Sequence, residues 1–183
     1  MAAPNRRPET DFPRQAVLKN GVAILNRPQG HPDVYGAIKE RGLLYVTTFR
    51  ELRKRYGEEE AISIMRSVSH AHGVQVGTSM AQFGPRDFEG ICKAWVLSPE
   101  NGATFRPDIR RLDELGIEVK MTACPIKDAW VDSGCSDEEI CTLLYCASAY
   151  DRAALETAGF ACEIELWSPG KDGCCLTRIT EKS

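Results

Sequence analysis

The chain has 183 residues, of which 43% are hydrophobic, and its formal net charge at pH 7 is -3. This length is sufficient for one sizeable hydrophobic core, and the slightly acidic balance gives no reason to expect nucleic acid as a partner. No segment approaches the ~20 apolar residues that a membrane span requires, and the N-terminus lacks the apolar stretch of a secretory signal. We therefore expect a cytoplasmic protein with no membrane partner, in which the cysteines stay reduced.

The first half of the chain is predicted to be helical. Residues 1–12 are polar and proline-rich, which predicts a flexible N-terminus. In residues 13–98, apolar side chains recur at helical spacing, which predicts helices over 13–25, 35–56, 58–80 and 86–97. Gly73 and Gly77 each weaken the helix over 58–80 by about 1 kcal/mol relative to alanine, but they allow close approach of another helix or a ligand.

The second half, residues 99–183, combines strands with helices. Ile117, Val119 and Met121 alternate with polar residues, which is typical of a strand. Strands are expected over 108–114, 117–123, 162–167 and 174–180, and helices over 125–133 and from 136 to about 149. Short strands joined by turns favour antiparallel pairing. Residues 13–183 are thus predicted to form a single α+β domain, in which a helical half packs on a roughly four-stranded, mostly antiparallel sheet.

Cysteine is unusually frequent and unevenly distributed. Of eight cysteines, seven lie after residue 120. Without a secretory signal, these are interpreted as reactive or metal-binding thiols, or as buried thiols that pack like small apolar side chains. No Cys-x-x-Cys pair or zinc-finger spacing occurs, so no cofactor is expected, although a zinc site assembled from distant cysteines and a histidine stays an alternative.

Cys124 has the most informative position. It follows the predicted strand over 117–123, and Pro125 is suited to the first position of a helix. A thiol at such a junction faces unpaired backbone N–H groups and the positive end of the helix dipole, and both favour the nucleophilic thiolate. The same N–H groups can stabilise an oxyanion. The alternative is a packing residue that happens to precede a helix.

Other reactive side chains lie on the next predicted helix. Cys141 and Cys146 are interpreted as core thiols or reactive thiols, and Tyr150 shares a helix face with Cys146. Asp151 is expected at or just past the helix end, where it would cap the helix, pair with an arginine or act as a base.

Two pairs of neighbouring residues complete the set. His70 and His72 lie about 200° apart around their helix, so one of them can face the thiols as a general base. Cys174 and Cys175 are adjacent in the last predicted strand, so they are expected to point to opposite faces of the sheet.

Taken in order, these features resemble the L-2-amino-thiazoline-4-carboxylic acid hydrolase family over roughly residues 117–180. The residues that carry the resemblance are Cys124-Pro125, Gly134, Cys146, Asp151, Gly159-Phe160, Gly170 and Cys174. The last motif of the family usually reads Gly-Asp-x-x-Cys with an acidic residue and an aromatic after the cysteine, whereas here Lys171 follows Gly170 and Cys175 follows Cys174. This departure concerns the substrate more than the fold.

The resemblance implies hydrolysis of a C=N or C–N bond in a small strained or cyclic compound, as in the thiazoline ring of the namesake substrate. Cys124, or else Cys146, would attack the electrophilic ring carbon, and Asp151 or a histidine would move protons. Such a reaction would belong to natural-product metabolism or self-protection.

The same resemblance implies that Cys174 lines the substrate pocket, as a second thiol or a metal ligand, and we expect Tyr150 and Trp130 to contact the small-molecule substrate. Two alternatives remain: a non-catalytic domain that binds a small molecule or a metal, as in sensor proteins, and a zinc-dependent hydrolase that uses these cysteines as ligands. The sequence leaves the oligomeric state open, a homo-oligomer included.

Overall fold

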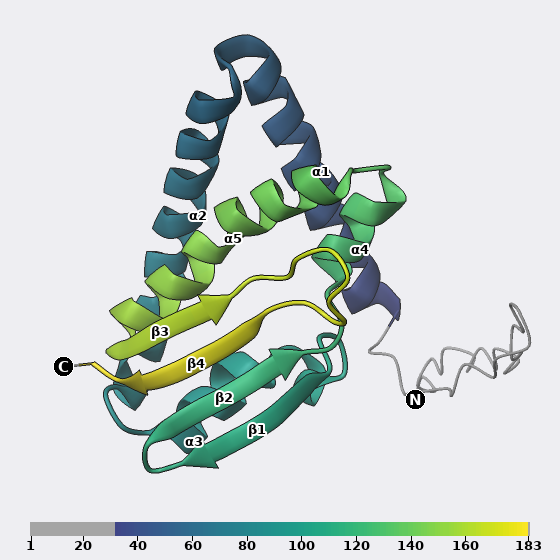
Figure 1. The fold of residues 1–183 in the computed structure, drawn as a ribbon. Helices are drawn as coiled ribbons and strands as arrows, with labels where there is room; N and C mark the ends of the chain where they lie inside the picture. Colours follow the sequence, from purple (N-terminus) through teal and green to yellow (C-terminus); the bar gives the residue numbers. More distant parts are fainter. Residues whose placement is uncertain (1–31, 183) are drawn as a thin grey trace, which may run out of the picture.

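The computed structural model describes residues 32–182, so the tail and the helix expected over 13–25 lie outside the described residues. Two long helices, α1 (Pro32–Tyr56) and α2 (Glu58–Met80), form an antiparallel hairpin that rises above the sheet (Figure 1). The bend between them is Gly57, whose φ of 87° suits a residue without a Cβ. The bounds predicted for α2 are confirmed, and α1 begins three residues earlier than expected.

The helix predicted over 86–97 is wrong in its regularity. It is divided into α3 (Phe88–Ile91) and a π-helical turn, η2 (Cys92–Val96). Asp87 starts α3 two residues later than predicted, because its carboxylate accepts a hydrogen bond from the Gly90 N–H at 2.7 Å. The wider turn is closed by the Leu97 N–H, which donates to the Cys92 carbonyl at 2.9 Å.

An open four-stranded antiparallel sheet confirms the α+β prediction. Its strands are β1 (Pro107–Asp113), β2 (Gly116–Met121), β3 (Phe160–Glu165) and β4 (Leu176–Glu181), in the spatial order β1-β2-β4-β3. The remaining helices are α4 (Pro125–Asp132) and α5 (Asp137–Thr157), and two short turns, η1 (Ala81–Phe83) and η3 (Glu100–Gly102), flank the α3 region. β4 starts two residues later than predicted, which leaves Cys174 and Cys175 in the preceding loop.

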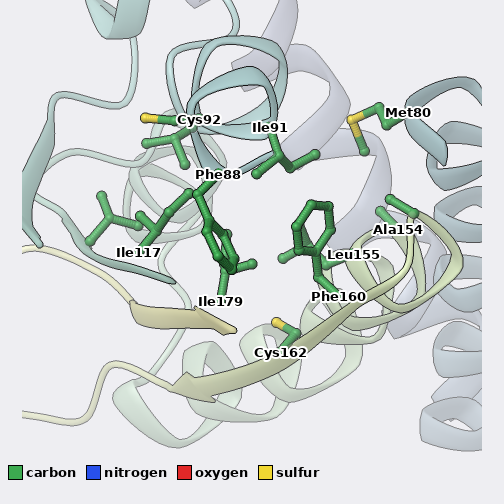
Figure 2. Packing of buried hydrophobic residues seen from close by; sticks show 13 residues of the cluster. Met80, Phe88, Ile91, Cys92, Ile117, Ala154, Leu155, Phe160, Cys162 and Ile179 are labelled. Carbon is green, nitrogen blue, oxygen red and sulfur yellow. The ribbon is translucent and has the colours of Figure 1, made fainter. Parts of the chain in front are cut away.

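One face of the sheet is covered by α3, η2 and the C-terminal part of α5. Figure 2 shows Phe88 of α3 pointing toward Ile117 and Ile179 of the sheet. The rings of Phe88 and Phe160 lie 5.6 Å apart. These side chains are at most 4% exposed, so this cluster forms a dry core beneath the sheet.

The two long helices α2 and α5 are in direct backbone contact. A Cβ on Gly73 would lie 2.3 Å from the Tyr150 carbonyl oxygen, and a Cβ on Gly77 would lie 2.3 Å from that of Ala154. The predicted close approach of another helix at these two glycines is therefore confirmed. The contact fixes α5 against the helical hairpin. A second cluster of buried side chains, which includes Val46, Met65 and Leu143, lies between α5 and the hairpin. Within residues 32–182, no helix is both long and apolar enough to cross a membrane.

Candidate active site

Cys124 is the N-cap residue of α4, as its position before Pro125 predicts. Its sulfur accepts a hydrogen bond from the Lys127 N–H, with an N–S distance of 3.5 Å. The side chain is 9% exposed and belongs to the core cluster between α1, α4 and α5. The thiol thus meets the free N–H groups at a helix start while most of its surface is shielded from water.

Cys174 and Cys175 lie beside this helix start, in the loop before β4. The Cys174 N–H donates to the Met121 carbonyl at 2.8 Å, and the Met121 N–H donates to the Cys175 carbonyl at 3.0 Å. The expectation that the two side chains point to opposite faces is wrong, since their sulfur atoms are 3.5 Å apart. The reason is that neither residue has the regular strand conformation that produces alternation.

The pKa values of the Cys124 and Cys174 thiols are shifted in opposite directions. A hydrogen bond from the Cys174 thiol lowers the pKa of Cys124 below its ordinary value, helped by the backbone N–H groups of Lys127 and Ile126 and opposed by burial. The same contact, together with Cys175, raises the pKa of Cys174 far above its ordinary value. Among these thiols, the proton therefore stays on Cys174 and the negative charge is favoured on Cys124.

Cys146 belongs to the same core cluster as Cys124 and Cys174, but no hydrogen bond within the described residues joins its thiol to theirs. It is fully buried on α5, and its thiol points to the Ile62 carbonyl at 4.0 Å. Burial raises its pKa to about 11. Its environment therefore disfavours thiolate, in contrast to that of Cys124.

Asp151 lies within α5 and not at its end, because residues 152–157 continue the helix up to the positive-φ Gly159. Burial raises the pKa of its carboxyl to about 7, although Arg41 and Arg152 act in the opposite direction. Its charge influences the nearby Cys162 on β3. No contact within the described residues joins Asp151 to the thiol group of Cys124.

The two histidines lie on α2 and are both exposed, so the expectation that one turns inward is wrong. The ring of His72 stacks on that of Tyr150, with centroids 5.2 Å apart, while His70 points to solvent. Trp130 is fully buried in α4, and its indole N–H donates to the Gly42 carbonyl at 2.9 Å. Of the expected site residues, Cys124, Cys174, Cys146 and Trp130 therefore share one core cluster, with Cys174 interacting with Cys124, whereas His70 and His72 lie on the exposed side of α2.

Sequence reasoning missed three contributors to this site. Cys175 was assigned to the wrong face, and Lys120 and Lys127, whose ammonium groups contact the loop that carries Cys174, gave no recognisable signal. The positions of Lys120 and Lys127 on either side of Cys124 gain meaning only when the structure shows the loop with Cys174 beside them. No group of three or more metal-binding side chains is arranged to hold an ion within residues 32–182.

Residues 37–169 match the model of the L-2-amino-thiazoline-4-carboxylic acid hydrolase family. The chain belongs to this family. The match includes most of α1 and all of α2, which lie outside the residues 117–180 that carry the resemblance in sequence. It also includes Cys124, Cys146 and Asp151, but it ends before Cys174. No curated protein matches the sequence. Family membership identifies the chain as a hydrolase of the thiazoline carboxylate type.

Proposed function

We propose that the protein is a cysteine-dependent hydrolase that opens a small cyclic compound containing a C=N bond, with Cys124 as the nucleophile. Family membership supports the hydrolase class and the thiazoline-like substrate. The observation that carries the assignment of Cys124 is its place at the start of α4, where a thiol and two backbone N–H groups lower its pKa. Such an environment is typical of reactive cysteines.

The proposed reaction proceeds through an intermediate in which the ring carbon is bonded to the Cys124 sulfur. The Cys124 thiolate adds to the ring carbon of the C=N group, and the π electron pair moves to the ring nitrogen, which takes a proton. The tetrahedral adduct expels one ring heteroatom, so the ring opens while the carbon stays bonded to sulfur. Water then attacks this carbon and releases the Cys124 thiolate, and its two protons replace those taken up by the product.

Cys174 is the proton donor that we propose for the first step. Its thiol holds a proton next to Cys124, and its pKa is high because of the sulfurs around it. Once Cys124 is bonded to carbon, its negative charge is gone and the Cys174 proton becomes available to the ring nitrogen. Asp151, His70 and His72 lack a contact with Cys124 within the described residues, so we place them outside this step.

We further propose a cytoplasmic role in natural-product metabolism or self-protection, where a reactive ring of this kind would be removed. Reduced thiols are required at Cys124 and Cys174, and a reducing compartment supplies them. The partner is then a small molecule.

The test is hydrolysis of L-2-amino-thiazoline-4-carboxylate, followed by mass spectrometry of the product that has gained one water. Cys124→Ala is expected to lower kcat by at least about 1,000-fold with a native circular dichroism spectrum. Cys92→Ala, which removes a buried thiol from the other core cluster, is the matched control and keeps the activity. Activity that survives Cys124→Ala and is lost in Cys146→Ala would move the nucleophile to Cys146. Binding of the compound without turnover by the unmodified protein would identify a non-catalytic binding domain and refute the proposal.

A further inference from the structure

Two lysines contact consecutive carbonyl groups of the loop that carries Cys174. Lys120, in β2, donates its ammonium to the Cys174 carbonyl at 2.8 Å. Lys127, in the first turn of α4, donates to the Gly173 carbonyl at 2.6 Å. The two lysines flank Cys124 in the sequence, four residues before it and three residues after it. The segment that presents Cys124 therefore holds the segment that presents Cys174 at two adjacent points.

The lysines act beside the backbone hydrogen bonds that join Cys174 and Cys175 to Met121, whereas the tip of the loop is open. Gly170 has a positive φ and no atom near its Cβ position, and the side chains of Lys171 and Asp172 are exposed. The Lys127 ammonium also lies 4.7 Å from the centre of the Trp167 ring, near the other end of the loop. Charged donors form stronger hydrogen bonds than neutral ones, so these contacts restrict the position of Cys174.

Gly173 allows the close contact between the loop and β2. Its φ is +71°, and a Cβ there would lie 2.8 Å from the Met121 carbonyl oxygen. The loop can thus lie directly on the end of β2, where the carbonyls of Gly173 and Cys174 come within reach of the lysines.

The lysines act on Cys124 through Cys174. The groups that lower the pKa of Cys124 are the Cys174 thiol and two backbone N–H groups, and neither ammonium is among them. We propose that Lys120 and Lys127 are positioning residues that hold the Cys174 thiol against the Cys124 sulfur and so keep Cys124 in its nucleophilic form. This inference rests on the proposed function of Cys124 and adds how the loop supports it.

The experiment is the pH profile of Cys124 alkylation by iodoacetamide, measured without substrate by peptide mass spectrometry. Lys120→Met and Lys127→Met are each expected to raise the midpoint by about one pH unit, which is a tenfold lower thiolate fraction well below the midpoint. Lys127→Met retains the backbone N–H that binds the sulfur, so its effect reports the side chain alone. Lys120→Arg keeps a charged donor and is expected to return the midpoint at least halfway to that of the unmodified protein.

Lys171→Met is the matched control, because its ammonium binds Glu165 at 2.6 Å and not a loop carbonyl. Its midpoint should equal that of the unmodified protein. If a Met variant fails to fold, the folded Lys120→Arg variant provides a second test of the positioning role. Peroxide should form its Cys124–Cys174 disulfide at a rate near that of the unmodified protein. Unchanged midpoints in both Met variants would refute the positioning role and leave the hydrolase proposal intact, whereas full turnover by Cys124→Ala would refute Cys124 as the nucleophile and leave the measured midpoints unaffected.

Discussion

Replacing Gly73 with alanine should force α2 and α5 apart and destabilise the protein. The new Cβ would lie 2.3 Å from the Tyr150 carbonyl oxygen, about 1 Å short of the ordinary contact range that begins at 3.4 Å. Overpacking of this kind costs about 1–3 kcal/mol, and alanine returns about 1 kcal/mol through its higher helix propensity. We therefore expect a net loss of about 0–2 kcal/mol, and a loss of about 1 kcal/mol lowers Tm by about 2–4 °C for a chain of this size.

Gly36 supplies the matched control for this change. It also lies in a long helix, α1, but no atom lies within 4 Å of its Cβ position. Gly36→Ala should stabilise the protein by about 0.5–1 kcal/mol through helix propensity alone. Thermal and urea unfolding followed by circular dichroism under reducing conditions compare the two variants. If Gly73→Ala were stabilised as much as Gly36→Ala, the tight packing of α2 on α5 would be refuted.

Three further predictions follow from the buried acid and the thiols. Since burial raises the pKa of Asp151 from 3.8 to about 7, ionisation of this carboxyl destabilises the fold as pH rises between these values. Asp151→Asn removes this loss, so the variant should be more stable than the unmodified protein by about 2 kcal/mol at pH 8, a figure reduced because the side chain is partly exposed. At pH 4 urea unfolding should find almost no difference between the two proteins. Peroxide should join Cys124 to Cys174, and peptide mapping that finds Cys124 only as sulfinic acid would contradict their contact. Iodoacetamide should abolish turnover of the thiazoline while a chelator leaves it unchanged; sensitivity to the chelator would favour the zinc-dependent alternative.

The sequence predicted the secondary structure well where local signals were strong. The helical spacing of apolar residues placed α2 correctly, and alternation in Ile117, Val119 and Met121 located β2. The prediction failed at Asp151, although the following residues Arg152–Glu156 are strong helix formers that extend α5 to Thr157. It also missed the π-helical turn at Cys92, which depends on a wider hydrogen bond that no residue type specifies.

For the site, the local part was predictable and the assembled part was not. Cys124 could be recognised from its Pro125 neighbour and the preceding strand. The approach of Cys174 depends on the pairing of β2 with β4 and on where β4 begins, which are long-range properties. Lys120 and Lys127 resemble ordinary surface lysines until the loop carbonyls are in place.

Cys124 is proposed as the nucleophilic thiol of this protein because its pKa is lowered, and the pH dependence of its alkylation tests this most directly. Brief alkylation of the native protein over a range of pH, read for each cysteine by mass spectrometry, gives individual midpoints that do not depend on exposure. We expect Cys124 to have a midpoint below the ordinary value of 9.0 and Cys146 to have a midpoint near 11. Cys135, which follows α4, is also expected near 11 because burial and the neighbouring Glu139 raise its pKa. A Cys124 midpoint as high as those of Cys135 and Cys146 would contradict the account.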